Sequence, residues 1–141
     1  MTQSTVNLSP AALSRHLRQC LDNREFDAFA LHCSDKLVAH VGGQDHDLAS
    51  WKAMGMAFFE AFPDAHHDFL HVAESADTAT LVCRFSGTHK GALMGIPASG
   101  RKVSFDLILV DRIVDGRVVE HWGQFDTASL MKQIMGEGAQ G

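Results

Sequence analysis

The spacing of apolar residues is helical in the first half of the chain and changes to alternation in the second half. Ser9-Pro10 is typical of a helix start, with serine as the N-cap and proline at the first helical position. A second short helix is predicted at about residues 24–33. A third runs from Leu48, which follows a capping Asp47, to about residue 62, where Pro63 ends it. The first helix is apolar at the spacing of a buried stripe, at Leu13, Leu17, Cys20 and Leu21.

Strands dominate the rest of the chain. A short strand is predicted at residues 36–41, and apolar runs predict four more at residues 69–74, 78–88, 102–114 and 117–125. A last short helix, capped by Asp126 or Thr127, ends near residue 135. Helices followed by an antiparallel meander indicate an α+β fold, and no parallel crossover is needed. We expect a cone-shaped barrel, in which a curved antiparallel sheet wraps around the long third helix and leaves one open mouth.

The last two strands are predicted to form a hairpin around Asp115-Gly116, because a two-residue turn needs positive φ at both central positions. Directly opposed residues in a hairpin share a face of the sheet. A face that mixes apolar side chains with a carboxylate and an imidazole suits a pocket wall. A single bulge would move the carboxylate to the opposite face. Counting from a tight turn, this face carries Asp106, Ile108, Val110, His121, Gly123 and Phe125.

Composition narrows the function classes. The chain has 141 residues, 45% of them hydrophobic and 21% charged, with a net charge of −5, which predicts one globular domain over residues 1–141 with a core at about 9–135. It has no basic stripe and no apolar run of membrane-spanning length, so we expect neither a nucleic acid nor a membrane as a partner. The N-terminus does not resemble a secretory signal, and the three cysteines form no Cys-x-x-Cys pair, which favours reduced thiols in a cytoplasm.

Two residues of the hairpin are candidates for proton transfer. His121 has an imidazole, which accepts and releases protons near neutral pH, and the alternative is a buried histidine satisfied by a backbone carbonyl. Asp106 is the candidate carboxylate beside it, and the alternative is a solvent-facing aspartate near a strand end. On the third helix, apolar side chains either line an adaptable pocket or fill an ordinary core, namely Trp51, Met54 and Phe58.

Other histidines have simpler interpretations. His66, His67 and His71 resemble metal ligands at first sight, but a metal site needs three or four convergent ligands and a supporting shell. We therefore expect them to be solvent-facing or packing residues, and we predict no metal ligands. His89, where a strand runs into a loop, is expected to form local hydrogen bonds that shape this loop.

Several motifs, taken in order and spacing, resemble the SnoaL-like polyketide cyclases of the nuclear-transport-factor-2-like superfamily. The resemblance extends over about residues 10–135. The motifs are Phe62-Pro-Asp64, Gly87-Thr-His-Lys-Gly91, Met94-Gly-Ile-Pro-Ala-Ser-Gly-Arg101, Arg112, Asp115-Gly116, Glu120-His-Trp122 and Phe125-Asp126.

The resemblance implies an aldol-type ring closure without metal or cofactor, and a homodimer or higher homo-oligomer. It also implies a general acid/base aspartate two residues after the histidine of Glu120-His-Trp122, but this chain has Gly123 there. His121 is retained, and His40 is at a position where family members often carry a histidine that reaches the pocket mouth. One hypothesis is that Asp106 supplies the missing carboxylate, for which Gly123 leaves room.

The leading prediction is a cofactor-independent enzyme that transfers protons on a hydrophobic carbonyl compound, leading to cyclisation, isomerisation or elimination. His121 would be the acid/base, with Asp106 or His40 as a second proton-handling group. A hydrolase or dehydratase that uses a His/Asp pair to activate water is one alternative. A binding module whose pocket has lost its base is the other, because Gly123 replaces the family's aspartate.

Overall fold

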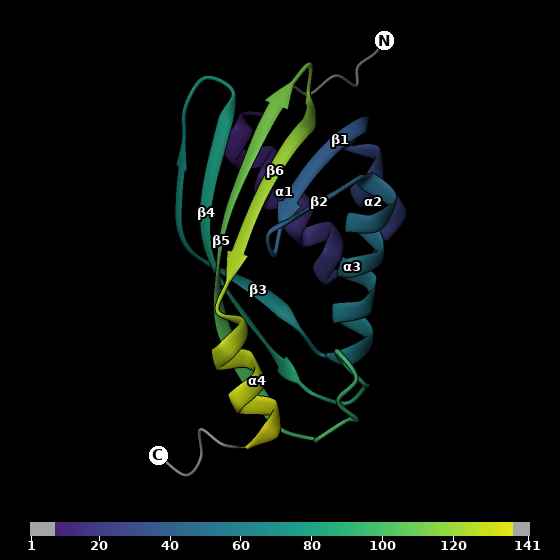
Figure 1. Ribbon diagram of the computed structural model, residues 1–141. Coiled ribbons are helices and arrows are strands. Elements are labelled where there is room, and N and C mark those ends of the chain that lie inside the picture. Colours follow the sequence, from purple (N-terminus) through teal and green to yellow (C-terminus); the bar gives the residue numbers. More distant parts are fainter. Residues whose placement is uncertain (1–7, 137–141) are drawn as a thin grey trace.

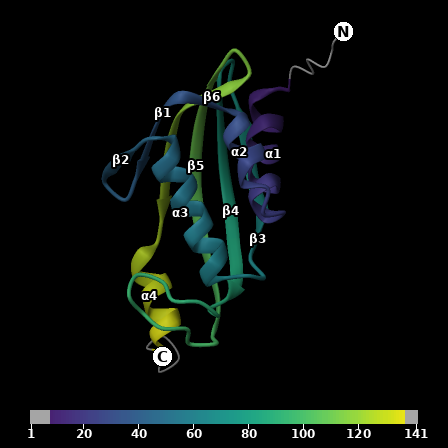
Figure 2. The ribbon, with the colours of Figure 1, turned by 90° about the vertical axis from the view of Figure 1, so that its right-hand side faces the viewer.

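The computed structural model describes residues 8–136, which form a curved six-stranded sheet with three helices packed against one face. Figures 1 and 2 show α1, α2 and α3 on the same side of the sheet, while α4 lies at the end of the long strands. The predicted α+β architecture is therefore confirmed, with a sheet that curves around the helices and does not close. The helices are α1 (Pro10–Asp22), α2 (Phe26–Leu31), α3 (Leu48–Ala61) and α4 (Thr127–Met135).

The predicted caps hold three of the helices. The Ser9 side chain accepts a hydrogen bond from the Ala12 backbone N–H at 3.2 Å. The Asp47 side chain accepts a hydrogen bond from the Ser50 backbone N–H at 2.8 Å, and the Asp126 side chain accepts one from the Ser129 backbone N–H at 2.9 Å. Each cap satisfies one backbone donor that the first helical turn leaves unpaired. These ends are therefore determined locally by the sequence.

The strand order is β2-β1-β6-β5-β4-β3, so β1 and the C-terminal β6 lie side by side. These two strands pair in parallel, which corrects the expectation of a wholly antiparallel sheet. The short β2, which was not predicted, pairs antiparallel with β1 through a turn at Gly42-Gly43. Helix α1 packs across β3, β4 and β5, while α2 packs on β1. The strands are β1 (Cys33–Val41), β2 (Gln44–His46), β3 (His66–Glu74), β4 (Thr78–Thr88), β5 (Lys102–Val114) and β6 (Arg117–Phe125).

The hairpin of β5 and β6 has the predicted limits and turn but not the predicted register. Asp115 and Gly116 both have positive φ, and Val114 pairs with Arg117 as counted. The register then shifts between Arg112 and Ile113, because β6 has one extra residue there. This bulge exchanges the two faces of β5 relative to those of β6. Asp111, rather than Val110, is therefore opposite His121.

The buried side chains form two large clusters that meet below the sheet. One cluster joins α1, α2, β1 and α3, and includes Leu17, Phe29 and Trp51. The other joins α3, β4, β5 and α4, and includes Phe62 and Phe85. Where the two clusters meet, residues of α1, α3 and the sheet face one another.

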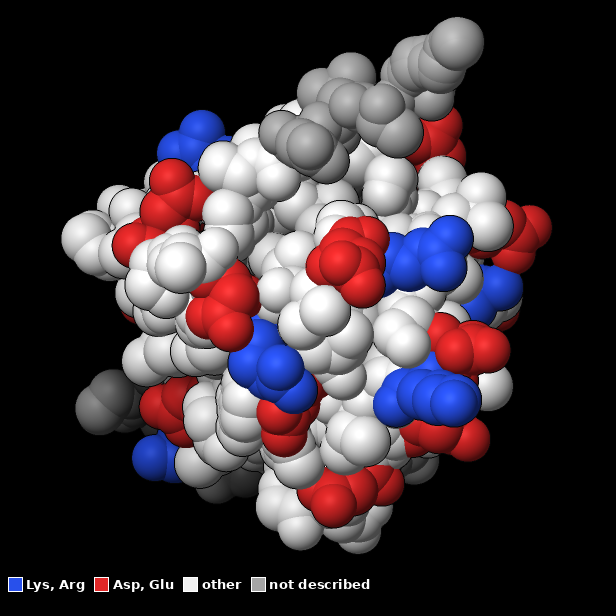
Figure 3. Space-filling model, turned by 90° about the horizontal axis from the view of Figure 1, so that it is seen from above, with Lys and Arg blue, Asp and Glu red and all other residues white. Residues whose placement is uncertain are grey.

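The surface carries charges of both signs in close proximity. On the face seen in Figure 3, basic side chains lie beside acidic ones, and uncharged residues separate these groups. In the described part of the chain, no helix has the length and apolar character needed to cross a membrane.

Candidate active site

A cavity lies where the two core clusters meet. It has a volume of about 110 Å³, and its polar lining residues are Arg18, His67, His121 and Gln124. An apolar cavity of about 150 Å³ holds benzene, so this one accommodates roughly one small ring or part of a larger molecule. Most of its wall is apolar and aromatic, formed by Leu21, Val41, Trp51, Met54, Gly55, Phe58, Phe59, Phe85, Phe105, Leu107, Leu109, Gly123 and Phe125.

A fully buried carboxylate stands behind this wall. Asp111, on β5, is 0% exposed and accepts a hydrogen bond from the Ser14 hydroxyl at 2.8 Å. Arg18, one turn further along α1, pairs with the same oxygen. The other oxygen lies 2.7 Å from Nδ1 of His121. Ion pairing and hydrogen bonding together offset the cost of burying this charge.

The surroundings determine the protonation of this group of residues. Burial alone would raise the pKa of Asp111, but the Arg18 guanidinium and the hydrogen bond from His121 more than offset this and hold the pKa well below its usual range. Burial lowers the pKa of His121 below its ordinary 6.5, although Asp111 opposes the shift. At neutral pH the carboxylate is therefore ionised and the imidazole neutral. The proton of this neutral ring is on Nδ1, where it donates to Asp111, and the lone pair is on Nε2.

The ring of His121 stacks on one aromatic side chain and has a glycine next to Nε2. Trp51 of α3 stacks on it, with ring centroids 4.2 Å apart and an interplanar angle of 27°. On β6, Gly123 leaves space next to Nε2, since a Cβ atom at position 123 would lie only 2.9 Å from this nitrogen. Both His121 and Gly123 line the cavity. The glycine therefore provides room for the basic nitrogen, where the family resemblance implies an aspartate.

Gly123→Ala should lower the free energy of unfolding by about 1–3 kcal/mol, the usual cost of overpacking, because the new methyl group collides with the stacked imidazole. Chemical denaturation measures this change, and histidine NMR should show an altered Nδ1–H signal for His121.

Gly55→Ala is the matched control for that substitution. Gly55 also lines the cavity, but a Cβ there would make an ordinary 3.6 Å contact with Leu21. Since Gly55 lies within α3, alanine should raise stability by roughly 0.5–1 kcal/mol. A Gly123→Ala variant as stable as wild type, with an unchanged His121 signal, would show that the imidazole is not confined by this glycine.

The bulge removes three predicted residues from the cavity. Asp106, Ile108 and Val110 lie on the outer face of β5, and Asp106 pairs there with Arg84 at 2.9 Å. The predicted placement of Asp106 beside His121 is therefore wrong, and Asp111 occupies that place. The other five residues predicted to contact substrate do line the cavity: Trp51, Met54, Phe58, Gly123 and Phe125.

His40 is also on the outer face rather than at the cavity. Its ring nitrogens lie 2.6 Å from Asp45 and 2.7 Å from Glu120, and its ring stacks on Trp122. The hydrogen bonds that its ring donates to Glu120 and Asp45 raise the pKa of His40. Its position therefore favours a surface ion pair over contact with a ligand in the cavity.

His67 lines the cavity, although it was expected to be a solvent-facing or packing residue. Its Nδ1 lies 2.7 Å from a carboxylate oxygen of Asp22, and its backbone N–H donates to the same carboxylate at 3.1 Å. The ring packs edge to face against Phe85. A second histidine–aspartate pair thus faces the cavity from β3 and α1. β3 begins at His66 rather than at the predicted residue 69, and the local sequence does not identify the partner at residue 22.

The remaining histidines of interest lie elsewhere. His66 is exposed near Asp68, and His66 and His71 do not line the cavity. His89 is buried and shapes its loop as predicted, since the Ser99 backbone N–H donates to its Nδ1 at 3.1 Å.

Comparison with known proteins identifies one family and one fold. DnrD, the aklanonic acid methyl ester cyclase of Streptomyces peucetius, is 34% identical over 71 residues, which are 50% of this chain and 49% of that protein. The match therefore spans about half the length of this curated relative.

Solved structures share the fold. AclR from Streptomyces galilaeus superposes with a TM-score of 0.81 at 25% identity, covering 87% of this chain and 92% of that one. IdmH from Streptomyces antibioticus superposes with a TM-score of 0.82 at 22% identity, covering 90% and 99%. The profile of one family, described as SnoaL-like polyketide cyclase, matches residues 11–134. The chain belongs to the SnoaL-like polyketide cyclase family.

Proposed function

We propose that this protein removes a proton from the carbon next to a carbonyl group and so catalyses an aldol-type cyclisation or isomerisation without a cofactor. One observation carries the proposal: Nε2 of His121 borders an apolar cavity while Asp111 holds Nδ1 on the other side of the ring. A neutral imidazole with its lone pair toward a substrate is the arrangement that general base catalysis requires.

His121 both takes and returns the proton, so the reaction needs no other acid or base. Nε2 of His121 takes the α-proton, and the electrons of the broken C–H bond form the enolate. In a cyclisation, the enolate carbon attacks a second carbonyl of the same molecule and a C–C bond forms. The resulting alkoxide takes the proton back from Nε2–H, so His121 returns to its neutral form. Asp111 stabilises the imidazolium between the two transfers, as the aspartate of a histidine–aspartate pair does.

The positive charge of Arg18 suits the enolate oxygen. Arg18 lines the cavity, and its Nη2 lies 3.4 Å from Nδ1 of His121. A fixed charge in a site with little water stabilises developing negative charge more strongly than it would in bulk solvent. His67, held by Asp22, is a second group able to exchange a proton with the substrate.

The cavity wall supports a hydrophobic, aromatic substrate class. Phe58 and Phe125 lie edge to face with ring centroids 5.8 Å apart, and both are only partly buried, unlike Trp51 of the same wall. Because the cavity holds roughly one ring, the reacting part of the substrate would enter while the rest extends toward these two side chains. The name of DnrD, a cyclase of an acid methyl ester, supports a carbonyl ester of polyketide type.

Deuterium exchange at the activated carbon of a small aromatic β-keto ester, followed by NMR, tests the proposal. The protein should accelerate exchange above the buffer rate. Because burial lowers the pKa of His121, the basic form persists through neutral pH, and the rate should fall only as pH decreases below 6.5. An increase in rate as pH falls through this range would contradict a neutral imidazole as the base.

If the exchange rate equals the buffer rate for several such esters, the proposal that the protein forms an enolate is wrong. The histidine–aspartate pair can also activate water, so hydrolysis or dehydration would then be tested next, with ligand binding without turnover as the remaining outcome. The homodimer and the cytoplasmic location stay predictions.

A further inference from the structure

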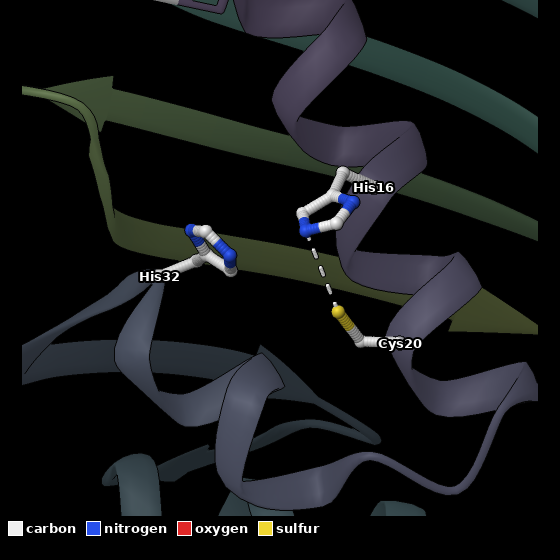
Figure 4. Close-up of side chains that lie close together, drawn as sticks. All are labelled: His16, Cys20 and His32. Atoms are coloured by element: carbon white, nitrogen blue, oxygen red, sulfur yellow. Dashed lines mark hydrogen bonds between the residues drawn. The ribbon is translucent and has the colours of Figure 1, made fainter. Parts of the chain in front are cut away.

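A second group of side chains with metal-binding chemistry lies outside the cavity. His16 and Cys20 are one turn apart on α1, and His32 follows α2 directly. Figure 4 shows their rings and thiol facing a common space between the two helices. One ligand atom from each residue lies within 4.8 Å of the other two. None of the three lines the cavity.

The spacing is near that of a coordinated ion. Zinc bonds of about 2.0–2.3 Å to nitrogen and sulfur place two ligand atoms roughly 3.3–3.8 Å apart in a tetrahedral site. Nε2 of His16 and Sγ of Cys20 are 3.7 Å apart. The His16 and His32 rings meet edge to face with centroids 4.8 Å apart. Rotation about the His32 side-chain bonds can move its ring nitrogen by roughly 1 Å, which would bring all three ligand atoms to the spacing of a tetrahedral site.

The surroundings suit these ligands. Cys20 is buried, so solvent does not compete for an ion on the side of the thiol. His16 and His32 are partly exposed, which provides an entry path and room for a water ligand.

We propose that His16, Cys20 and His32 bind one Zn²⁺ ion, with water as the fourth ligand. Two imidazoles and a thiolate match the preference of this borderline-soft ion. The alternative for the same geometry is a hydrogen bond between the thiol and His16, with His32 packed against it.

The position of the site indicates a structural role. The backbone carbonyl of His32 accepts a hydrogen bond from Val118 of β6 at 3.0 Å, so the ion would connect α1 to the junction between α2 and the sheet. The same helix carries Ser14 and Arg18, which hold Asp111. Because Zn²⁺ would bind the folded protein and not the unfolded chain, it would stabilise this arrangement and raise the melting temperature.

Co²⁺ titration of the tag-free, metal-free protein tests the site, because a cobalt–thiolate bond gives a charge-transfer absorption band. Wild type should bind one equivalent with this band, and Zn²⁺ should displace Co²⁺. Cys20→Ser should lose the band. His16→Ala and His32→Ala change partly exposed residues and should stay folded. Each should lower the affinity for Co²⁺ by more than about 100-fold, because loss of a residue that only supports a ligand already costs about 10- to 100-fold.

Cys83→Ala and His66→Ala are the matched controls, since each removes the same ligand type from another part of the fold. Both should keep the band and the affinity of wild type. Wild type without a thiolate band, a band that survives Cys20→Ser, or an affinity unchanged in both His16→Ala and His32→Ala would each overturn the proposal. A Zn²⁺-dependent rise in melting temperature that is equal in wild type and Cys20→Ser would do the same.

Discussion

Replacing His121 by asparagine should reduce the accelerated exchange rate by about 10²–10⁴-fold, the usual contribution of a positioned general base. The amide keeps a polar group next to Asp111 but provides no basic nitrogen at the cavity. Loss of Nε2 should therefore affect the proton-transfer step, while binding of the ester changes little. Exchange kinetics at saturating and limiting ester concentrations separate these two effects.

His40→Asn is the control for this substitution. It removes another histidine that has an aspartate neighbour, but this one lies on the outer face of the sheet. Its exchange rate should stay close to that of wild type. Equal losses in both variants would indicate damage to the fold, and an unchanged rate in His121→Asn would remove His121 as the base.

Arg18→Met should have the largest effect on stability, lowering the free energy of unfolding by about 3–5 kcal/mol. Methionine fills much of the space of arginine but leaves the Asp111 carboxylate buried without its positive partner. A single hydroxyl and a neutral imidazole do not compensate a fully buried charge. Urea denaturation measures the loss.

Two further variants identify the cause of that loss. Arg84→Met breaks an arginine–aspartate pair on the outer face, where both side chains are about half exposed, at 49% and 50%, and it should have little effect. Adding Asp111→Asn to Arg18→Met removes the unpaired charge and should recover part of the stability. If the double variant is no more stable than Arg18→Met, the loss comes from packing of the arginine side chain.

The hairpin shows the limit of counting along a sequence. Asp115-Gly116 determines the turn because few residues tolerate positive φ at two successive positions, and the limits of both strands followed from it. The bulge in β6 has no comparable sequence signal. One extra residue moved Asp106 outward and Asp111 inward, so the expected pairing of a carboxylate with His121 exists, but with the other aspartate.

The second histidine–aspartate pair and the proposed zinc ligands show a different limit. His67 lies beside Asp22, 45 residues away in the chain, and the parallel pairing of β1 with β6 brings together residues 33–41 and 117–125. His16 and Cys20 had a visible helical spacing, yet their third partner follows a different helix. Contacts of this kind depend on how elements pack, which local periodicity does not contain.

The sequence by itself determined three helix caps, the limits of β4, β5 and β6, the family and the apolar side of α3, because each depends on residues close together in the chain or on motifs in order. Only the tertiary structure decided which carboxylate holds His121, what Gly123 makes room for, and which histidines face the cavity. The physical reason is that strand register and helix packing are set by the burial of whole faces. A register shift of one residue leaves the local sequence pattern intact, but moves every side chain beyond it to the other face of the sheet.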